Sequence, residues 1–425
     1  MPADVNRTID AVWRIESARL IGALARRVRD VGLAEDLAQE ALVAALEQWP
    51  ESGVPDNPGA WLMGTAKHRA IDRLRRAEVH ERKTRELGRE LELQGGTEVV
   101  DLDARIDDPF DDDLLSLIFT ACHPVLSTEA RVALTLRLLG GLTTREIARA
   151  YLVPESTVAQ RIVRAKRTLS AARVPFEVPG RDELAARLAS VLEVVYLVFN
   201  EGYAATAGDA WMRPELIEEA LRLGRILAGL LPSEPEVHGL VALMELQASR
   251  SRARTGPAGE PVLLLDQDRA RWDWMLVGRG LAALDRAVQT GGALGPYTLQ
   301  AAIAACHARA RVAADTDWER IVTLYEALGR VAPSPVVELN RAVAVSMAAG
   351  PEPALALVDA LAAEPALAGY HLLPTVRGDL LARLGRDAEA RVEFQRAAEL
   401  TQNARERAVL LARSAGGSAR NGARH

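Results

Sequence analysis

Residues 141–169 read GLTTREIARAYLVPESTVAQRIVRAKRTL and predict two short helices joined by a tight turn. Thr143, with Glu146 three positions later, has the pattern of a capping box at the start of the first helix. A turn at residues 153–154 ends that helix, and the next helix begins near Glu155. Two helices joined this closely, the second rich in arginine, are typical of a helix-turn-helix whose second helix enters the DNA major groove.

The second of these helices has an apolar face and a basic face. Four apolar residues recur at intervals of four, three and four positions, which is the spacing of one helix face: Val158, Ile162, Ala165 and Leu169. Between Arg145 and Arg173 the chain holds seven basic and two acidic residues. A local basic patch favours nucleic acid even in a chain of net charge −6. A solvated basic helix is the alternative.

A second basic segment lies nearer the N-terminus. Residues 67–76 hold five basic residues and one acid. Residues 49–58 are dense in helix breakers and predict a loop. Asn57 followed by Pro58 is a good N-cap and first-turn pair, so a helix is expected from about Gly59 to residue 76 or beyond. The whole segment 8–80 predicts three or four helices.

An acidic connector separates the two basic segments. Residues 86–113 contain eleven acids and only two arginines. Few of the residues are apolar, so residues 81–113 are interpreted as a linker with little fixed structure. A flexible acidic chain could bind inside a positively charged channel of a partner. A spacer that is merely exposed to solvent is an equally good interpretation.

Composition predicts an all-α, multidomain protein. The 425 residues exceed one ordinary core, and 49% hydrophobic residues with only 4% aromatics favour helices. No apolar run approaches about 20 residues, and no signal peptide is visible, so neither a membrane span nor export is expected. Two cysteines cannot form a disulfide framework, which fits a reducing cytoplasm.

The C-terminal part, from about residue 180 to residue 412, predicts further helices with a repeat. Gly350 and Gly385 lie 35 positions apart, each inside a helix-turn-helix pattern. The better copy runs through Gly378, Ala390, Phe394 and Ala397, whose spacings match the small and large positions of a tetratricopeptide repeat. We expect a tetratricopeptide-like helical array at residues 282–412.

The two basic segments resemble domains 2 and 4 of extracytoplasmic-function (ECF) sigma factors, which are bacterial promoter-recognition subunits of RNA polymerase. Domain 2 is indicated by AEDLAQEA at residues 34–41, NPGAWL at 57–62 and AKHRAIDRLRR at 66–76. Domain 4 is indicated by GLTTREIA at 141–148 and VPESTV at 153–158. Two motifs in the right order make the resemblance specific, whereas the second alone is shared by many helix-turn-helix regulators.

This resemblance implies a helical-bundle sigma domain 2 at residues 8–80 and a sigma domain 4 with a helix-turn-helix at residues 114–173. The remainder resembles the ECF subgroup with a large tetratricopeptide extension, through FTACHP at 119–124 and VFNEGY at 198–203. A family-specific helical domain is expected at residues 180–281. The expected function is to direct core RNA polymerase to promoters, with the extension regulating that activity.

By the same resemblance, one helix docks on polymerase. Its contact residues with the β′ subunit would be Asp36, Gln39 and Glu40, and the β subunit would take part as well. Carboxylates beside an amide suit an arginine-rich partner surface. The alternative is a solvated helix face.

The resemblance also implies two promoter contacts. Ser52 and Asn57 would meet a flipped base of the minus-ten element, and Trp61 is either a stacking residue or a core residue. Phosphates of that strand would be bound by Lys67, Arg69, Arg73, Arg75 and Arg76. Base edges of the minus-thirty-five element would be read by Glu155, Ser156, Thr157, Gln160 and Arg161, with phosphates held by Arg164, Lys166 and Arg167.

Two other function classes compete with this interpretation. An enzyme is the first alternative. In the pairs Cys122-His123 and Cys306-His307 the two side chains point about 100° apart on a helix, so neither pair predicts nucleophilic catalysis. The histidines do not have the spacing of metal ligands and no glycine-rich phosphate loop is present, so neither a metal nor a cofactor is expected. A helix-turn-helix regulator with a tetratricopeptide sensor is the remaining alternative, although it leaves residues 8–80 without a role. The extension itself could bind a protein partner in a concave groove, where Trp272, Trp274 and the stretch 200–203 could lie. For both tryptophans, packing in the core is the favoured alternative.

Overall fold

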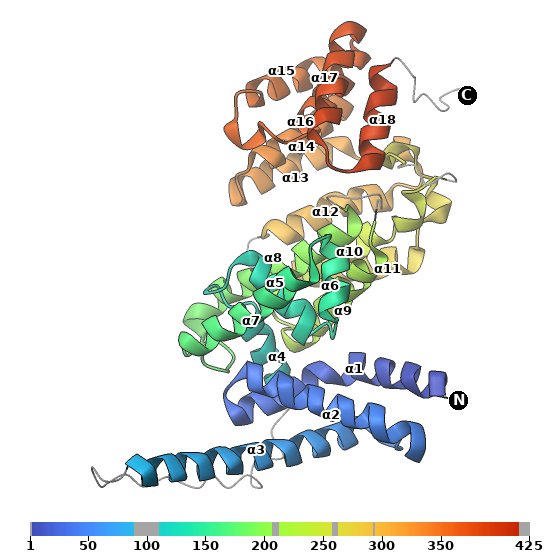
Figure 1. The fold of residues 1–425 in the computed structure, drawn as a ribbon. Coiled ribbons are helices and arrows are strands. Elements are labelled where there is room, and N and C mark those ends of the chain that lie inside the picture. Colours follow the sequence, from blue (N-terminus) through green and yellow to red (C-terminus); the bar gives the residue numbers. More distant parts are fainter. Residues whose placement is uncertain (1, 89–109, 206–211, 257–261, 292–293, 416–425) are drawn as a thin grey trace. The chain divides into compact units, whose positions relative to one another are not determined.

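The computed structural model describes residues 2–88, 110–205, 212–256, 262–291 and 294–415. Throughout these ranges the regular elements are α-helices and short 3-10 helices, with no β-strand (Figure 1). The all-α class expected from composition is therefore confirmed. The chain divides into two compact units, residues 1–194 and residues 195–425, and each is described by itself.

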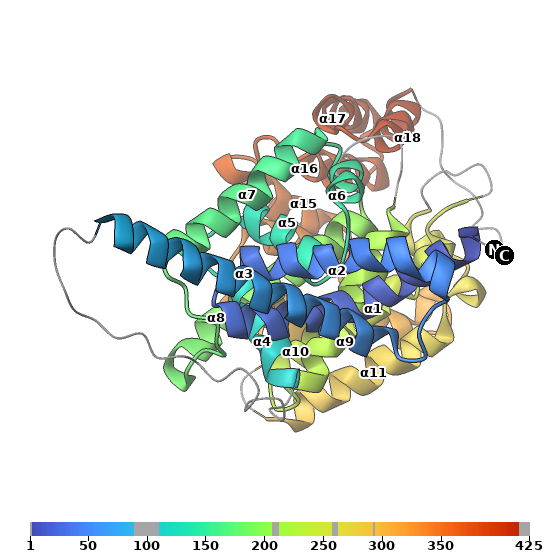
Figure 2. The same cartoon turned by 60° about the horizontal axis from the view of Figure 1, so that its bottom comes forward.

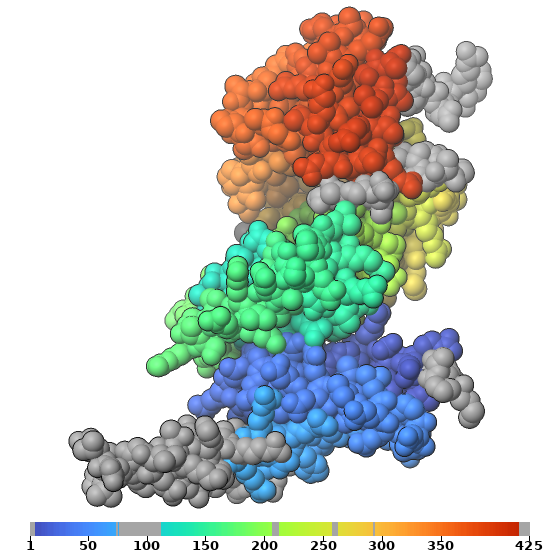
Figure 3. Space-filling view, viewed as in Figure 1, coloured from blue at the N-terminus to red at the C-terminus, as the bar shows by residue number. Residues whose placement is uncertain are grey.

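The first unit begins with three long helices that pack side by side, α1 (Pro2–Val28), α2 (Val31–Ser52) and α3 (Pro58–Gly88) (Figures 1 and 2). Their shared core is formed by fully buried side chains of all three helices, including Ile21, Leu24, Leu37, Trp49 and Leu62. In the space-filling view the N-terminal helices form one continuous blue surface (Figure 3). Three helices agree with the three or four expected from this part of the sequence, while the domain limits 8–80 stay a prediction.

Two expectations for this bundle need correction. The loop expected from residue 49 begins only at Gly53, because α2 continues through Pro50 and closes with a hydrogen bond from Gly53 N to Trp49 O of 2.9 Å. Burial of the Trp49 side chain, 1% exposed, holds this last turn on the core despite the proline. Similarly, the linker expected from residue 81 is helical up to Gly88, since α3 runs on through residues of high helix propensity.

Four further helices of the first unit are α4 (Phe110–Ala121), α5 (Thr128–Leu138), α6 (Thr144–Tyr151) and α7 (Glu155–Ala171). Residues 110–113, expected in the linker, are the first turn of α4. Asp113 is held there because Arg26 of α1 pairs with its carboxylate at 3.1 Å, and acids are favourable in a first helical turn. The rest of the expected linker, residues 89–109, lies outside the described residues.

The helix-turn-helix forms as its sequence predicts. Thr143 and Glu146 make the capping box, with Glu146 N donating to Thr143 Oγ1 at 3.2 Å and Thr143 N donating to Glu146 Oε2 at 2.8 Å. The first helix ends at Leu152, which has φ of +51° in the left-handed region. The apolar face expected for α7 is the buried one: Val158, Ile162, Ala165 and Leu169.

Helix α8 (Arg181–Tyr203) contains the limit between the two units. Its first half packs on α4 and α5, where Arg187 donates to Phe119 O at 3.0 Å and Ser190 donates to Cys122 O at 2.7 Å. These bonds make the beginning of α8 part of the first unit. The sequence-based domain limits are finer than the two units and stay predictions.

The second unit continues with helices that pack mainly on their neighbours along the chain. They are α9 (Pro214–Leu230), α10 (Pro235–Ala248), α11 (Trp274–Gln289), α12 (Pro296–Arg309), α13 (Trp318–Val331), α14 (Pro335–Ala348), α15 (Pro351–Leu361), α16 (Leu372–Arg383), α17 (Asp387–Leu400) and α18 (Ala404–Ser414). Short 3-10 helices lie between some of them: η1 (Ser251–Ala253), η2 (Leu264–Asp266), η3 (Arg269–Arg271), η4 (Ala313–Asp315) and η5 (Pro365–Leu367). The C-terminal helical array expected from the sequence is thus present.

The best copy of the expected repeat is the pair α16 and α17. Gly385 turns the chain between them with φ of +75°, a conformation that favours glycine. Gly378 of α16 lies against the ring of Phe394, and a Cβ at residue 378 would come within 2.7 Å of that ring. Ala390 and Ala397 are buried beside it. The small and large positions pack as the repeat pattern predicts, while membership of the tetratricopeptide family stays a proposal.

Candidate nucleic-acid interface

The outer face of α7 carries most of the predicted minus-thirty-five residues. Glu155, Ser156, Gln160, Arg164 and Arg167 are exposed, and Thr157 and Arg161 are partly exposed. The face follows from the fold, because the apolar residues of the helix are turned toward α5 and α6. Within the described chain, neither Arg164 nor Arg167 forms an ion pair, so both guanidinium groups are available to phosphates.

Lys166 is the exception on this helix. Its ammonium group lies 2.5 Å from Glu35 Oε2 and 3.9 Å from Asp36 Oδ1, both on α2. The Lys166 side chain is only 19% exposed. In this conformation Lys166 is therefore turned toward the N-terminal bundle rather than presented to DNA.

Glu35 is the centre of that contact, and the sequence did not single it out. Its carboxylate also accepts hydrogen bonds from Arg137 Nε of α5 at 2.7 Å and from Gln39 Nε2 at 2.8 Å. The Glu35 side chain is 5% exposed. One buried carboxylate thus binds two cations, one from α5 and one from α7. These three residues, Glu35, Arg137 and Lys166, are the Glu35 cluster.

The basic face of α3 carries the predicted minus-ten phosphate contacts. Arg69 and Arg73 lie 3.4 Å and 3.2 Å from the two carboxylate oxygens of Glu40 on α2. Arg75 is exposed and Lys67 is partly exposed. The side chain of Arg76 lies outside the described residues. Two arginines that are predicted to bind DNA therefore pair here with a glutamate that is predicted to bind polymerase.

The turn before α3 positions the remaining minus-ten residues. Asn57 caps α3, accepting a hydrogen bond from Ala60 N at 3.0 Å, as the sequence predicts. Ser52 lies on the last turn of α2 rather than in the loop, and its hydroxyl donates to Gln48 O at 2.9 Å. Trp61 is partly buried and meets Trp49 edge to face, with ring centroids 5.3 Å apart. Trp61 therefore packs on the core while part of it stays accessible.

Family models match these same segments. Residues 14–79 match sigma-70 region 2, and residues 116–169 match sigma-70 region 4. The first covers the bundle with the basic face of α3, and the second covers the helix-turn-helix. Both regions occur in the order expected of sigma factors. The ECF RNA polymerase sigma factor SigK of Mycobacterium ulcerans is 31% identical over 157 residues, which cover 36% of this chain and 78% of SigK. The chain belongs to the ECF family of RNA polymerase sigma factors.

Two further relatives match different shares of the chain. An uncharacterized protein of Rhizobium meliloti is 46% identical over 398 residues, which cover 92% of this chain and 91% of that protein. The ECF RNA polymerase sigma factor SigC of Mycobacterium tuberculosis is 29% identical over 180 residues, 42% of this chain and 86% of SigC.

The match of the C-terminal extension of this sigma factor does not indicate a function. Residues 187–288 match DUF6596, a family of unknown function. No solved structure matches the chain.

The predicted polymerase-binding residues of this sigma factor lie on one stretch of α2. Asp36 is exposed, whereas Gln39 and Glu40 are partly buried by the side chains they bind. Glu35, one position before Asp36, is the functional candidate that sequence reasoning missed. The sequence did contain a signal for it. Ala34 and Ala38 mark the buried face of α2, and Glu35 lies at the border of that face, where a carboxylate needs a partner.

The thiols of this sigma factor are not arranged for nucleophilic chemistry. Burial raises the pKa of the Cys122 thiol to about 11, and its sulfur lies 3.3 Å from Thr135 Oγ1. Burial, followed by the nearby Asp317, also raises the pKa of Cys306. Both thiols therefore stay protonated near neutral pH. Among the described residues no group of His, Cys, Asp or Glu side chains could hold a metal ion, and no helix could cross a membrane.

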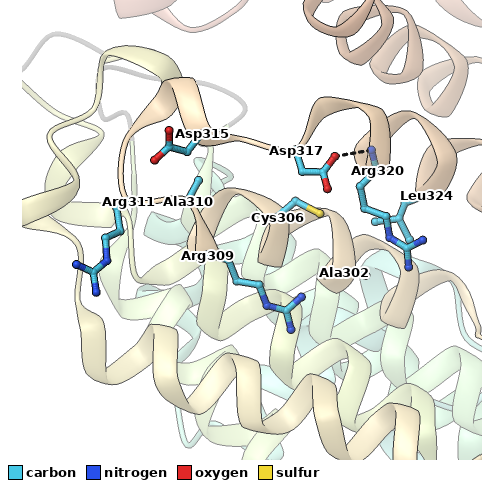
Figure 4. Close-up of a pocket in the computed structure, with 9 residues that line it drawn as sticks. All are labelled: Ala302, Cys306, Arg309, Ala310, Arg311, Asp315, Asp317, Arg320 and Leu324. Carbon is cyan, nitrogen blue, oxygen red and sulfur yellow. Dashed lines mark hydrogen bonds between the residues drawn. The ribbon is translucent and has the colours of Figure 1, made fainter.

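Cys306 lines a cavity of about 510 Å³ between the end of α12 and α13 in the second unit (Figure 4). The side chains of Arg309 and Arg320 extend on either side of the thiol, while the carboxylate of Asp317 caps α13 by accepting from Arg320 N at 2.9 Å. Arg309 and Arg320 are exposed. Because ions in the solvent can neutralise the exposed guanidinium groups of Arg309 and Arg320, the charges at this cavity do not require a bound ligand.

Proposed function

We propose that this sigma factor directs core RNA polymerase to promoters through the minus-ten and minus-thirty-five contacts assigned above, and that its C-terminal extension regulates this activity. The observation that carries the proposal is the exposed polar and basic face of α7, joined in the same unit to the basic face of α3. A helix-turn-helix alone would support DNA binding, and the bundle supplies the second contact that a sigma factor requires. Cytoplasmic location follows from the partner, because polymerase and promoter lie there.

The minus-thirty-five contact is proposed to divide along α7. Glu155, Ser156, Thr157 and Gln160 are at the N-terminal half of the helix, where base edges come within reach. Arg164 and Arg167 follow along the exposed face and suit phosphates. Neutralising about four phosphates would make the logarithm of the binding constant fall with the logarithm of the salt concentration with a slope of about −3.6, and the non-specific affinity would be weak. Binding to polymerase would make the second promoter contact intramolecular and so raise the affinity.

The polymerase contact is proposed to use α2. Asp36 offers an exposed carboxylate to a basic partner surface, with Gln39 and Glu40 on the next turn. Glu40 already pairs with Arg69 and Arg73, so an arginine of polymerase would compete with these two. Because those pairs are solvent-exposed, each is worth at most about 1 kcal/mol and is easily exchanged.

Transcription in vitro tests the promoter function. The purified full chain is added to core polymerase of the same host freed of other sigma subunits, on a template library of host promoters. Promoter-specific transcripts are expected from the native chain, and a large loss from the double variant Arg164→Ala, Arg167→Ala. Arg181→Ala, an exposed arginine in the first turn of α8, is the matched control and keeps full activity.

The alternative function, a helix-turn-helix regulator, gives a different result in the same experiment. Such a regulator would bind DNA by itself but would produce no transcript without another sigma subunit. Specific DNA binding combined with failure to associate with core polymerase would therefore replace the proposed function by the regulator.

Truncation tests the regulatory role of the extension. The cut is placed after Ala205 rather than near residue 180, because the first half of α8 supplies Arg187 and Ser190 to the core of the first unit. We expect the truncated chain to transcribe in vitro but to lose its response to growth conditions in cells. Unchanged activity together with an unchanged response would remove the regulatory role.

A further inference from the structure

Three arginines of the second unit gather around two aromatic rings. The guanidinium carbons of Arg250 and Arg254 lie 5.8 Å and 3.6 Å from the centroid of the Tyr203 ring. The guanidinium carbons of Arg250 and Arg269 lie 6.0 Å and 4.9 Å from the Trp272 ring. Arg250 therefore shares one ring with each of the other two arginines. We call these five residues the arginine cluster.

Two of the arginines have structural partners. Arg254 is 8% exposed and donates to the carbonyl oxygen of Tyr203. Arg269 is 6% exposed and donates to the carbonyl oxygens of His307 and Ala310. These bonds tie η1 and η3 to their neighbouring segments. Arg254 and Arg269 therefore have a sufficient role in holding the fold.

Arg250 has no such role. Its side chain is partly buried, and its guanidinium group forms neither a hydrogen bond nor an ion pair with any residue that the structure describes. Nearby on α10, Glu245 is already engaged by Arg225 at 2.8 Å and by Arg279 at 3.4 Å. A partly buried cation close to two others is unfavourable unless an anion balances it.

Among the described residues, two carboxylates act on this cluster, Glu406 on Arg254 and Asp315 on Arg269, and neither forms an ion pair with Arg250. Burial, followed by Arg250 and Arg269, lowers the pKa of His307 to about 4, so this ring is neutral near pH 7. Burial raises the pKa of Tyr325 to about 12, which leaves its hydroxyl protonated. Glu406 acts on Arg254, but its carboxylate also pairs with His371 at 3.2 Å and accepts from Thr401 Oγ1 at 2.6 Å.

We propose that Arg250, flanked by the rings of Tyr203 and Trp272, binds the oxyanion of a small ligand, either a carboxylate or a phosphate group. The guanidinium fork matches both anions with two parallel hydrogen bonds, which an ammonium group cannot do. Because this site lies in the second unit, its ligand is a candidate signal for the extension. The binding itself does not depend on the proposed sigma function.

Calorimetric titration of the full chain tests the site. Inorganic phosphate and succinate are titrated separately at constant ionic strength, with chloride as the matched anion. Saturable binding of either probe is expected, and the probe that binds identifies the oxyanion. Arg250→Gln should bind at least about tenfold more weakly, because a charge-assisted hydrogen bond contributes more than that factor. Arg286→Gln, an exposed arginine of α11, is the control and should bind as the native chain does.

Thermal unfolding without ligand gives a second measurement. If Arg250 serves a ligand, Arg250→Gln removes repulsion from the arginine cluster and raises the unfolding midpoint, whereas a structural arginine would lower it. Arg250→Lys keeps the charge but lacks the fork, so it should fold and bind the probe several-fold more weakly. The proposal is overturned if neither probe binds saturably, if Arg250→Gln binds as the native chain does, or if that variant is less stable without ligand.

Discussion

Glu35 shows how one residue can decide the conformation of the first unit. Its buried carboxylate binds Arg137 of α5 and Lys166 of α7, so replacement by alanine leaves two cations without their counter-charge. Breaking a buried ion pair in this way costs about 3 kcal/mol or more. We therefore expect Glu35→Ala to lower the free energy of unfolding of the first unit by about that amount.

Urea unfolding followed by hydrogen-exchange mass spectrometry can measure this, because it reports the two units separately. Arg14→Ala is the control. Its guanidinium pairs with Glu146 at 3.4 Å with side chains 68% and 37% exposed. An exposed pair of this kind is worth less than about 1 kcal/mol, so equal losses in the two variants would contradict the role given to Glu35.

His307 makes the second unit sensitive to acid. Burial, followed by Arg250 and Arg269, lowers its pKa to about 4 in the folded chain, against the ordinary value near 6.5. The unfolded chain therefore binds the proton first as pH falls, and the contribution of His307, complete above about pH 6.5, is lost progressively down to about pH 4. Between pH 7 and pH 5 the expected loss from this residue is about 2 kcal/mol.

Urea midpoints at several pH values check this expectation. His307→Gln is expected to flatten the pH dependence of the second unit, even if it lowers stability at every pH. A variant with the same slope as the native chain would assign the acid sensitivity to other groups.

At the scale of elements, two glycines on helices should respond oppositely to alanine. In Gly378→Ala the new Cβ would meet the buried Phe394 ring at 2.7 Å, so we expect a loss of about 1–2 kcal/mol from strained packing between α16 and α17. Gly278 of α11 has nothing within 4 Å of the position of a Cβ. Gly278→Ala should therefore gain about 0.5–1 kcal/mol from helix propensity alone.

Circular dichroism during thermal unfolding distinguishes the two variants. The glycine pair is informative because both substitutions are chemically identical and lie in the same unit. Stabilisation by Gly378→Ala would mean that α16 and α17 do not approach as closely as the repeat pattern predicts.

Local signals in the sequence were sufficient for elements that depend on neighbours in the chain. The capping box of Thr143 and Glu146, the N-cap at Asn57 and the apolar face of α7 all depend on residues within about one turn or on one helical period, and all form as predicted. The repeat signal at Gly378 and Phe394 succeeded for the same reason, because both lie in one helical hairpin.

The errors concern contacts between distant residues. Pro50 stays in a helix because Trp49 is buried by the bundle, and Asp113 starts a helix beside Arg26. Local propensity cannot reveal either partner. Glu35 and Lys166 are 131 positions apart, and only the packing of α7 near α2 makes them a pair. The same distance explains why the sequence did not reveal the ion pair of Lys166, whose contact with DNA stays a prediction.

At the scale of the whole first unit, the Glu35 cluster joins the two segments that are proposed to contact the promoter. A DNA phosphate can bind Lys166 only after its ammonium group leaves Glu35. The promoter-bound form must therefore separate α7 from α2 at this point, or leave Lys166 out of the DNA contact. Asp36 lies on the same edge of α2, so polymerase binding would act on this contact too.

Lysine chemistry can follow this contact directly, because the sequence contains only three lysines, Lys67, Lys83 and Lys166. In the free chain Lys166 is 19% exposed and paired, so its acylation by a small activated ester should be slow. Glu35→Gln removes the charge that holds it while keeping the shape of the side chain. We expect the acylation rate of Lys166 to rise about fivefold or more in Glu35→Gln, since loss of about 1 kcal/mol of pairing gives a factor of this size.

The rate at Lys67, which lies on α3, should be the same in both proteins. Mass spectrometry of the digested chain gives each rate in one experiment, and an unchanged rate at Lys166 would show that Glu35 does not hold α7 against α2 in solution.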